Sequence, residues 1–495
     1  MKLSKQILLL LFFALYSVSF AQSKYEVRGV WFSTVWGLDF PSKPASSAST
    51  IERQKKELTA KLDSLQKINI NTLFFQVRNR GDLSYESKIE PWHYVFGGKT
   101  GVSPGYDVVQ FAITEAHKRG MEFHAWFVCM PLGSVKQVRD KKQLSLPAKH
   151  PDLCIKYKDE WYMNPANPNT SVYLANLIAE ATRKYDFDGV HLDYIRYPDR
   201  TDKYPDDQIF KRSKAKDLSQ WRRDNITRIV NTIHDSVKKV KPYIKVSAAV
   251  IGRYCELSHN KPGWRGFEDV FQDAMQWINT GKIDFITPMT YYQDPLFGII
   301  VADWCKRLKP DQIIPGVYTS MISPKERNWS AEDLFDQVMI ARLCGAGGIA
   351  HFRAQPLIYN EKKLSTMLAS EHYRRPGAIF PQRNQPKCGS ITAVPHVSEF
   401  KFENNVFSIK WESMGKELRY NIYGSESPDI DINEGAYLIC TNIDSNELLL
   451  SSESYPKLRY IIVTSVDRYG NESGPSSIIS LGMNSNDALA PLFDK

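Results

Sequence analysis

Short apolar segments alternate with longer amphipathic segments along the first three quarters of the chain. The short segments are rich in Val, Ile and Phe, which is typical of strands that are buried on both faces of a parallel sheet. We expect strands at residues 27–32, 72–77, 121–127, 187–193, 244–250, 283–289, 313–318 and 348–352.

The segments between these strands have the apolar spacing of helices. They lie near residues 50–68, 106–119, 172–185, 216–240, 266–280, 297–308, 330–344 and 361–372. Eight strands in strict alternation with eight helices over residues 25–375 predict an α/β fold, the (β/α)₈ TIM barrel. The alternative is a doubly wound open sheet, which usually carries a glycine-rich phosphate loop after its first strand. The sequence has no such loop there.

The pattern changes at a proline-rich linker, residues 376–388. Beyond it, short alternating segments predict a small all-β sandwich at residues 389–482, followed by a C-terminal tail at residues 483–495. We expect its strands at residues 406–411, 418–423, 437–439, 448–450 and 460–465. The segment that begins at Tyr460 and the core position of Trp411 resemble those of a fibronectin type III domain.

The chain begins with the pattern of a secretory signal peptide. Two lysines precede an unbroken apolar run at residues 7–15, and the small residues Ser19 and Ala21 favour cleavage after residue 21. An uncleaved anchor is the alternative. No later run approaches the ~20 apolar residues of a membrane span. We therefore expect residues 1–21 to be removed from an exported protein, periplasmic or secreted, with no stable membrane insertion.

Composition and charge narrow the classes of protein that fit. The hydrophobic content of 42% excludes a disordered chain. The formal charge is +9, and loss of the signal peptide with its two lysines lowers it to +7. Both signs are mixed along the chain, so we expect no nucleic-acid partner. The seven cysteines never stand in CxxC spacing, which argues against a disulfide framework and against a zinc cluster.

Functional groups in a TIM barrel lie at the C-terminal ends of the strands, and this rule selects Asp193. Asp188 starts the fourth strand and Asp193 ends it, so about 16 Å separates them at ~3.3 Å per residue. Cooperating glycosidase carboxylates lie roughly 5–9.5 Å apart, so these two are not partners. His191 and Asp193 share a strand face that we expect to point into the barrel. The alternative is that Asp193 only caps the next turn.

Polar and aromatic residues gather at the other strand ends. Aromatic rings stack on the apolar faces of sugars, while Arg, Gln and Asn bind hydroxyl groups. Each ring taken singly is more simply explained as core, but their concentration at strand ends favours sugar binding. The candidate substrate-binding residues are Arg28, Trp31, Gln76, Arg78, Asp82, His124, Trp126, His191, Arg196, Tyr197, Tyr291, Gln293, Tyr318, His351 and Arg353.

Five motifs, in order along the chain, resemble the glycosyl-hydrolase-like family 10 group. They are VRGVWF at residues 27–32, NTLFFQVR at 71–78, PGYD at 104–107, HKRGMEFHAW at 117–126 and DGVHLDYIRYP at 188–198. The resemblance covers the barrel and implies a (β/α)₈ glycoside hydrolase, related to the α-galactosidase and α-amylase superfamilies, that cleaves peptide-free peptidoglycan strands. It places an acid at the end of strand four, which is Asp193. Many members carry a second acid beside it, where this chain has Tyr194.

The resemblance does not supply a second carboxylate, so position along the barrel must select it. Glu256 follows the fifth strand and Asp294 follows the sixth, and these two rank almost level. Asp273 ranks third because it lies in the following helical segment. In the usual division of roles, one carboxyl stays protonated as the acid and the other is ionised as nucleophile or base.

Histidines raise the question of a catalytic metal. His117, His124, His191 and His351 are far apart in sequence, and three of them would have to converge at the barrel mouth to bind one. Because no HxH or HExxH spacing exists, we expect neither a metal nor a cofactor.

The positive charge suits an acidic glycan. Peptide-free peptidoglycan carries a free lactyl carboxylate on every second sugar, and a basic protein attracts such a polymer. Arg78, Arg80, Arg196 and Arg353 are candidate carboxylate clamps. The alternative is that these arginines pair with local acids.

The sequence therefore predicts an exported glycoside hydrolase that acts on peptide-free peptidoglycan by a two-carboxylate mechanism. Two alternatives stay open. The chain is a hydrolase of another polysaccharide, or it is a non-catalytic carbohydrate-binding protein built on a degenerate barrel.

Overall fold

The computed structural model describes residues 23–199, 201–257, 263–383, 393–412, 415 and 417–481. The expected signal peptide and C-terminal tail lie outside these residues, as does the part of the expected linker after residue 383. Within the described ranges, no helix has both the length and the apolar character needed to cross a membrane.

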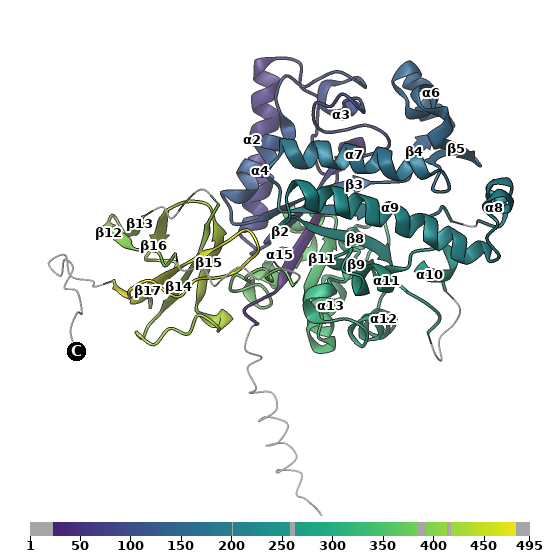
Figure 1. The fold of residues 1–495 in the computed structure, drawn as a ribbon. Coiled ribbons are helices and arrows are strands. Elements are labelled where there is room, and N and C mark those ends of the chain that lie inside the picture. Colours follow the sequence, from purple (N-terminus) through teal and green to yellow (C-terminus); the bar gives the residue numbers. More distant parts are fainter. Residues whose placement is uncertain are drawn as a thin grey trace, which may run out of the picture.

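Eight parallel strands close into a barrel (Figure 1). Their order around it is β1-β11-β10-β9-β8-β7-β3-β2, and pairing of Val27 with Gly348 and of Gly29 with Thr72 joins β1 to the last and the second strand. The TIM-barrel prediction is confirmed. The strands are β1 (Val27–Phe32), β2 (Thr72–Arg78), β3 (Glu122–Val128), β7 (Gly189–Asp193), β8 (Lys245–Ile251), β9 (Phe285–Met289), β10 (Gly316–Val317) and β11 (Gly348–Phe352).

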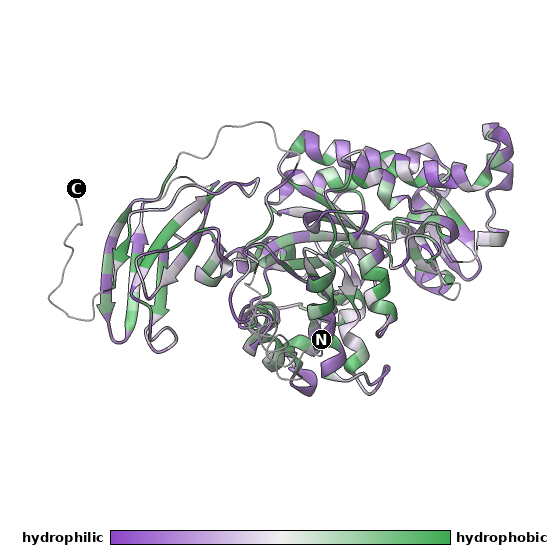
Figure 2. Ribbon diagram, turned by 90° about the horizontal axis from the view of Figure 1, so that it is seen from below, coloured by the Kyte–Doolittle hydropathy of each residue, from purple (hydrophilic) through white to green (hydrophobic). Residues whose placement is uncertain are grey.

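Helices surround the barrel and bury their apolar faces against the outer side of the strands. Figure 2 shows the resulting mixture of hydrophobic and hydrophilic residues along them. The main helices are α2 (Ala48–Gln66), α4 (Val108–His117), α7 (Pro168–Lys184), α9 (Leu218–Val240), α12 (Leu296–Cys305), α13 (Ala331–Cys344), α14 (Ala354–Ile358) and α15 (Leu364–Ser370). The helix expected at residues 266–280 is divided into α10 (Gly266–Asp269) and α11 (Ala274–Asn279), because Phe271 between them has a positive φ of 62°.

An inserted subdomain between β3 and α7 was not predicted from the sequence. Strands β4 (Pro131–Ser134), β5 (Cys154–Tyr157) and β6 (Glu160–Met163) form a small antiparallel sheet in the order β4-β6-β5, with α5 (Val135–Asp140) and α6 (Leu146–Lys149) between β4 and β5. Each strand has only four residues, which is too short for a periodic pattern to stand out. Because the insertion follows the C-terminal end of β3, it lies at the barrel mouth.

The C-terminal region is an all-β domain of two antiparallel sheets, as expected. One sheet has the order β12-β13-β16 and the other β15-β14-β17-β18, and Trp411 is buried between them. The first and last of these strands were not predicted, and the fibronectin type III resemblance stays a prediction. The strands are β12 (Val397–Glu403), β13 (Val406–Trp411), β14 (Arg419–Ser425), β15 (Leu438–Ile443), β16 (Glu447–Ser451), β17 (Tyr460–Val466) and β18 (Ile479–Ser480).

The all-β domain packs against the N-terminal ends of the barrel strands, on the left in Figure 1, whereas the inserted subdomain lies on the right. Asp188, immediately before β7, is the central contact. Its carboxylate binds Arg419 of β14 at 2.8 Å and His117 of α4 at 2.8 Å, and Arg468 lies 3.7 Å away. Burial would raise the pKa of Asp188, but these partners hold it well below its ordinary value. The two domains are therefore joined through a buried ion pair.

Replacement of Arg419 by Met should lower the free energy of unfolding by about 3–5 kcal/mol at pH 7, because it leaves the Asp188 carboxylate buried beside one partner fewer. The depressed pKa of Asp188 means that this loss is full above its unfolded value of 3.8 and shrinks as the pH falls below it. Chemical denaturation at several pH values measures both effects. Arg139→Met is the control, since this side chain is 73% exposed. Equal stabilities of the two variants would contradict the role of Asp188.

Candidate active site

Asp193 ends β7 and lies at the C-terminal mouth of the barrel. Its two carboxyl oxygens accept separate hydrogen bonds, from the Trp126 indole N–H at 3.0 Å and from the Tyr194 backbone N–H at 2.7 Å. Burial raises the pKa of Asp193 from 3.8 to about 6, against the opposing effects of these two donors and of Arg196. The carboxylate is therefore oriented and able to exchange a proton near neutral pH.

His191 lies on the same inward face of β7, one layer deeper, as the sequence predicted. Its Nε2 accepts a hydrogen bond from the Trp31 indole at 3.1 Å, and its Nδ1 is 2.9 Å from Ser247 Oγ. An indole N–H can only donate, so the proton of the neutral imidazole is on Nδ1. Burial holds the pKa of His191 well below its ordinary value. His191 and Trp31 thus form a neutral floor beneath Asp193.

Tyr194 and Arg196 form the rim next to Asp193. Tyr194 has a φ of 48°, rare for an aromatic residue, and its side chain is 42% exposed. The Arg196 guanidinium lies between two rings, 4.6 Å from the Tyr194 centroid and 4.9 Å from that of Trp264, and pairs with Asp199 at 2.7 Å. Its buried Nε has no hydrogen-bond partner among the described residues. This side of the mouth therefore presents two rings and a cation beside the carboxylate.

An aromatic cluster forms the opposite part of the mouth. Tyr291 follows β9, Tyr318 follows β10 and Phe352 ends β11, and their ring centroids lie 4.7–5.7 Å apart. The negative charge of Asp193 contributes, after burial, to raising the pKa of Tyr291 well above its ordinary value, so the two groups are close. The predicted residues Asp193, Trp126, Arg196, Tyr291 and Tyr318 are thus brought together at one end of the barrel.

Two predicted binding residues lie at the other end of the barrel. Arg28 is fully buried, donates to Glu26 at 2.8 Å and stacks over the Tyr373 ring at 4.6 Å. His124 lies near the start of β3, where its Nε2 is 2.9 Å from the Glu122 carboxylate. These positions correct our expectation that both residues face the mouth, because each belongs to the first half of its strand.

Several other predicted binding residues form hydrogen bonds or ion pairs with other residues of the chain. Arg78 binds Glu90 through two nitrogens at 2.7 and 2.8 Å, which leaves no free fork for a substrate carboxylate. His351 lies on the outer side of β11 and contacts Tyr373 at 3.0 Å. The remaining residues and their partners are Gln76 with the Thr34 and Val35 backbone, Asp82 with Lys141, Tyr197 with Asn225, Gln293 with Asp333, and Arg353 with Asp39.

The three acids expected to partner Asp193 have other contacts. Glu256 pairs with Arg265 at 3.1 Å. Asp273 caps the N-terminus of α11 and accepts a hydrogen bond from the Tyr254 hydroxyl. Asp294 accepts the Gly298 N–H, and burial together with two nearby acids raises its pKa. None of the three bonds to Asp193 among the described residues.

Glu160 is an acid at the mouth that the sequence analysis missed. It begins β6 of the inserted subdomain, accepts a hydrogen bond from the Tyr162 hydroxyl at 2.6 Å and pairs with Arg80 at 3.7 Å. Arg80 also acts on the pKa of Tyr194, the neighbour of Asp193. Glu160 is 39% exposed, and its hydrogen-bond partner Tyr162 lies close enough to Arg196 for that charge to act on the Tyr162 pKa. Only recognition of the inserted sheet would have placed Glu160 at the mouth.

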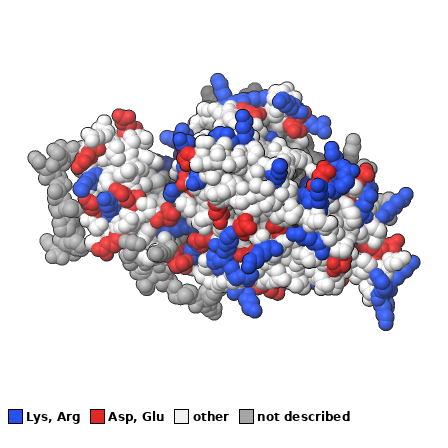
Figure 3. All heavy atoms as spheres, turned by 90° about the horizontal axis from the view of Figure 1, so that it is seen from above, with Lys and Arg blue, Asp and Glu red and all other residues white. Residues whose placement is uncertain are grey.

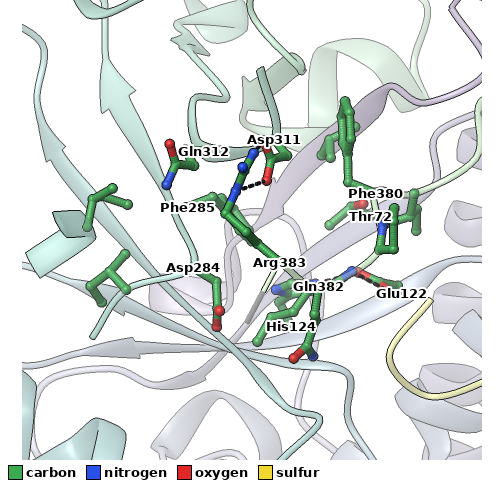
Figure 4. Close-up of a pocket in the computed structure, with 16 residues that line it drawn as sticks. Thr72, Glu122, His124, Asp284, Phe285, Asp311, Gln312, Phe380, Gln382 and Arg383 are labelled. Atoms are coloured by element: carbon green, nitrogen blue, oxygen red, sulfur yellow. Dashed lines mark hydrogen bonds and ion pairs between the residues drawn. The ribbon is translucent and has the colours of Figure 1, made fainter. Parts of the chain in front are cut away.

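A small cavity of ≈ 40 Å³ lies at the N-terminal end of the barrel (Figure 4). Linker residues Phe380, Gln382 and Arg383 close it, and Arg383 pairs with Asp311. Stability groups occupy this end of a TIM barrel, so we do not assign chemistry to it. Elsewhere in the described residues, no three His, Cys, Asp or Glu side chains converge as a metal site would require.

Asp193→Asn should change how stability depends on pH. Because the folded pKa of about 6 exceeds the ordinary 3.8, the wild type loses stability as the pH rises between these values, by up to about 3 kcal/mol. The variant lacks this loss, so its stability relative to the wild type should rise between pH 4 and pH 7. Urea titrations at both pH values give the comparison. A constant difference between the two proteins would show that Asp193 is an ordinary turn cap.

Comparison with known proteins agrees with this geometry. The family described as glycosyl hydrolase-like 10 matches residues 26–329. Glycosyl hydrolase YngK of Bacillus subtilis is 30% identical over 492 residues, which covers 92% of this chain and 93% of YngK. Glycosyl hydrolase DigH of Escherichia coli K12 is 30% identical over 317 residues, 58% of this chain and 72% of DigH.

Among solved structures, the glycoside hydrolase domain of PgaB from Bordetella bronchiseptica aligns with a TM-score of 0.48 and 12% identity. It covers 70% of this chain and 98% of that domain. The family match spans most of the barrel, and the match to YngK runs on into the all-β domain. The chain therefore belongs to the glycosyl hydrolase-like 10 family and is a glycoside hydrolase.

Proposed function

We propose that this protein is exported and cleaves glycosidic bonds in peptide-free peptidoglycan strands. The buried, doubly hydrogen-bonded carboxylate of Asp193, with its pKa near 6, carries the proposal of cleavage. Exposed aromatic side chains beside it suit the apolar faces of sugar rings. Export rests on the basic and apolar pattern of residues 1–21.

The position of Arg196 at the rim of the mouth supports the proposal that the substrate is acidic. Arg196 is held between the Tyr194 and Trp264 rings, and its Nε has no partner among the described residues. A buried donor left unpaired costs about 1–3 kcal/mol, which a bound carboxylate would recover. The lactyl carboxylate on alternate sugars of peptide-free peptidoglycan is such a group, and neutral polysaccharides lack it.

For the mechanism, we propose that Asp193 acts in its ionised form. The two N–H groups that hold its oxygens favour the carboxylate, and a pKa near 6 leaves most of it ionised at pH 7. Asp193 then stabilises the positive charge that develops at the anomeric carbon or attacks that carbon. A second carboxyl protonates the departing sugar oxygen, and a water molecule then adds to the anomeric carbon and returns a proton to that carboxylate.

Glu160 is our candidate for the second carboxyl. It is partly exposed at the mouth, and the Tyr162 hydroxyl fixes one of its oxygens at 2.6 Å. Burial raises the pKa of Tyr194, the residue that follows Asp193, and the charge of Arg80 opposes this rise, so Arg80 lies near the catalytic carboxylate. Asp273 and Asp294, by contrast, accept backbone N–H groups at helix N-termini. Glu256, on the loop after β8, is the competing candidate because its partner Arg265 adjoins Trp264 at the rim.

Asp193→Asn should lower the rate of glycan cleavage by at least about 10²-fold without loss of folding, because it removes the oriented carboxylate. Peptide-free peptidoglycan and a panel of neutral glycans serve as substrates, with the products separated by chromatography. We expect the wild type to release fragments from peptidoglycan only. Cleavage of a neutral glycan alone would assign another polysaccharide, and binding without any cleavage would identify a carbohydrate-binding protein.

Glu160→Gln should reduce kcat on the same substrate by about 10²-fold or more while KM changes little, since the loss is of proton transfer. Glu256→Gln is the matched variant and should retain most of the activity. A substrate whose leaving group needs no protonation, such as an activated aryl glycoside, should restore the rate of Glu160→Gln. If instead only Glu256→Gln lost activity, and the activated substrate restored it, Glu256 would be the residue that protonates the leaving group.

A further inference from the structure

A second concave surface lies beside the active site, over the C-terminal ends of β1, β2 and β3. This groove of ≈ 800 Å³ is lined by three segments that are distant in sequence. They are the turn after β1 with Trp36, the long loop after β2 from Asn79 to Thr100, and the inserted subdomain around Lys142. Asp193 does not line this groove, so the groove is distinct from the immediate surroundings of the catalytic carboxylate.

Two buried polar atoms in the groove wall have no hydrogen-bond partner among the described residues. They are Asn79 Nδ2 and His93 Nδ1, and both side chains belong to residues more than nine-tenths buried. His93 Nε2 lies 4.0 Å from the Asp82 carboxylate, which is too far for a hydrogen bond, so either ring nitrogen of His93 can carry the proton. One wall thus offers an amide donor and an imidazole nitrogen that can donate or accept. A hydroxyl group, which both donates and accepts, matches this pair.

Two exposed rings stand at the same groove. Trp36 is 56% exposed and Tyr94 is 40% exposed. Trp36 has a φ of 53°, and Gln76 Oε1 fixes the turn that carries it by accepting the N–H groups of Thr34 and Val35. A tryptophan held in the left-handed region with its ring in solvent costs about 1–3 kcal/mol, which is characteristic of a binding position. These rings supply the stacking surfaces that a sugar needs.

The charge of the groove is positive. Lys141 is neutralised by Asp82 at 2.7 Å and Arg80 pairs with Glu160, but Lys99 and Lys142 have no ion-pair partner in the described part of the chain. Basic and acidic residues are interspersed over the face shown in Figure 3, so positive charge alone marks no site there. The combination of free lysines with unpartnered buried atoms and exposed rings distinguishes this groove.

Arg80 connects the groove to the active site. Its guanidinium lies 5.5 Å from the centroid of the Trp36 ring. It is also close enough to Tyr194, next to Asp193, for its charge to oppose the rise that burial causes in the pKa of Tyr194. A chain of sugars bound at Asp193 can therefore continue across Arg80 into the groove.

We propose that the groove is a second binding site for the glycan, which holds a sugar remote from the cleaved bond. One ring packs on Trp36 and Tyr94, a hydroxyl bonds to Asn79 and His93, and a carboxylate on that sugar reaches Lys99 or Lys142. This inference rests on the proposed function, since it takes the same acidic polymer as ligand. It adds that recognition of the acid occurs away from the catalytic carboxylate.

The test uses charge reversal in the Asp193→Asn background, where we expect cleavage of bound glycans to be at least about 10²-fold slower. Lys99→Glu combined with Lys142→Glu should raise the Kd for hexasaccharides from peptide-free peptidoglycan at least tenfold. The Kd for the same hexasaccharides with reduced carboxyl groups should change less than twofold. Trp36→Ala should raise the Kd for both ligands. Isothermal titration calorimetry measures all of these values.

The control is Lys56→Glu with Lys239→Glu, which changes the net charge equally on α2 and α9, away from the groove. This control should leave every Kd unchanged. Equal losses in the control and the groove variant, or an unchanged Kd for the acidic ligand in the groove variant, would overturn the proposal. Groove-dependent binding by a wild type that cleaves no glycan would reject the proposed function but retain this site. Normal cleavage with groove-independent binding would do the opposite.

Discussion

Closure of the parallel barrel is the constraint on which the rest of the structure depends. Once β1 pairs with both β2 and β11, alternate residues of every strand must point inward. On β7 this order stacks Gly189, His191 and Asp193 along the barrel axis. Gly189 leaves room for the His124 ring, with which a Cβ atom at this position would clash. The neutral His191 fills the middle of the barrel, and Asp193 lies at the mouth.

The two acids on either side of this strand show how position sets chemistry. Asp188 and Asp193 are five residues apart and both are buried. Asp188 is surrounded by Arg419, His117 and Arg468, which keep it ionised and make it a structural anchor. Asp193 has two neutral N–H donors and one more distant cation, so burial prevails and its proton becomes exchangeable. One end of the barrel is thereby used for stability and the other for reactivity.

Residues governed by local periodicity could be predicted from the sequence, and residues governed by long-range partners could not. The bounds of β1 and β11 and the inward direction of Asp193 follow from the alternation of apolar positions. Whether an arginine is free depends on partners such as Glu90, which a folded loop brings onto Arg78. Glu160 was missed for a related reason, because its four-residue strand has no period of its own.

The linker packs in the N-terminal end of the barrel and determines on which side of the barrel the all-β domain lies. Phe380 stacks on Tyr25 and Gln382 reaches the Tyr243 carbonyl, so the chain leaves the barrel on the side away from Asp193. The described part of the all-β domain is therefore behind the mouth. A polysaccharide can thus approach the catalytic end broadside without contacting the second domain.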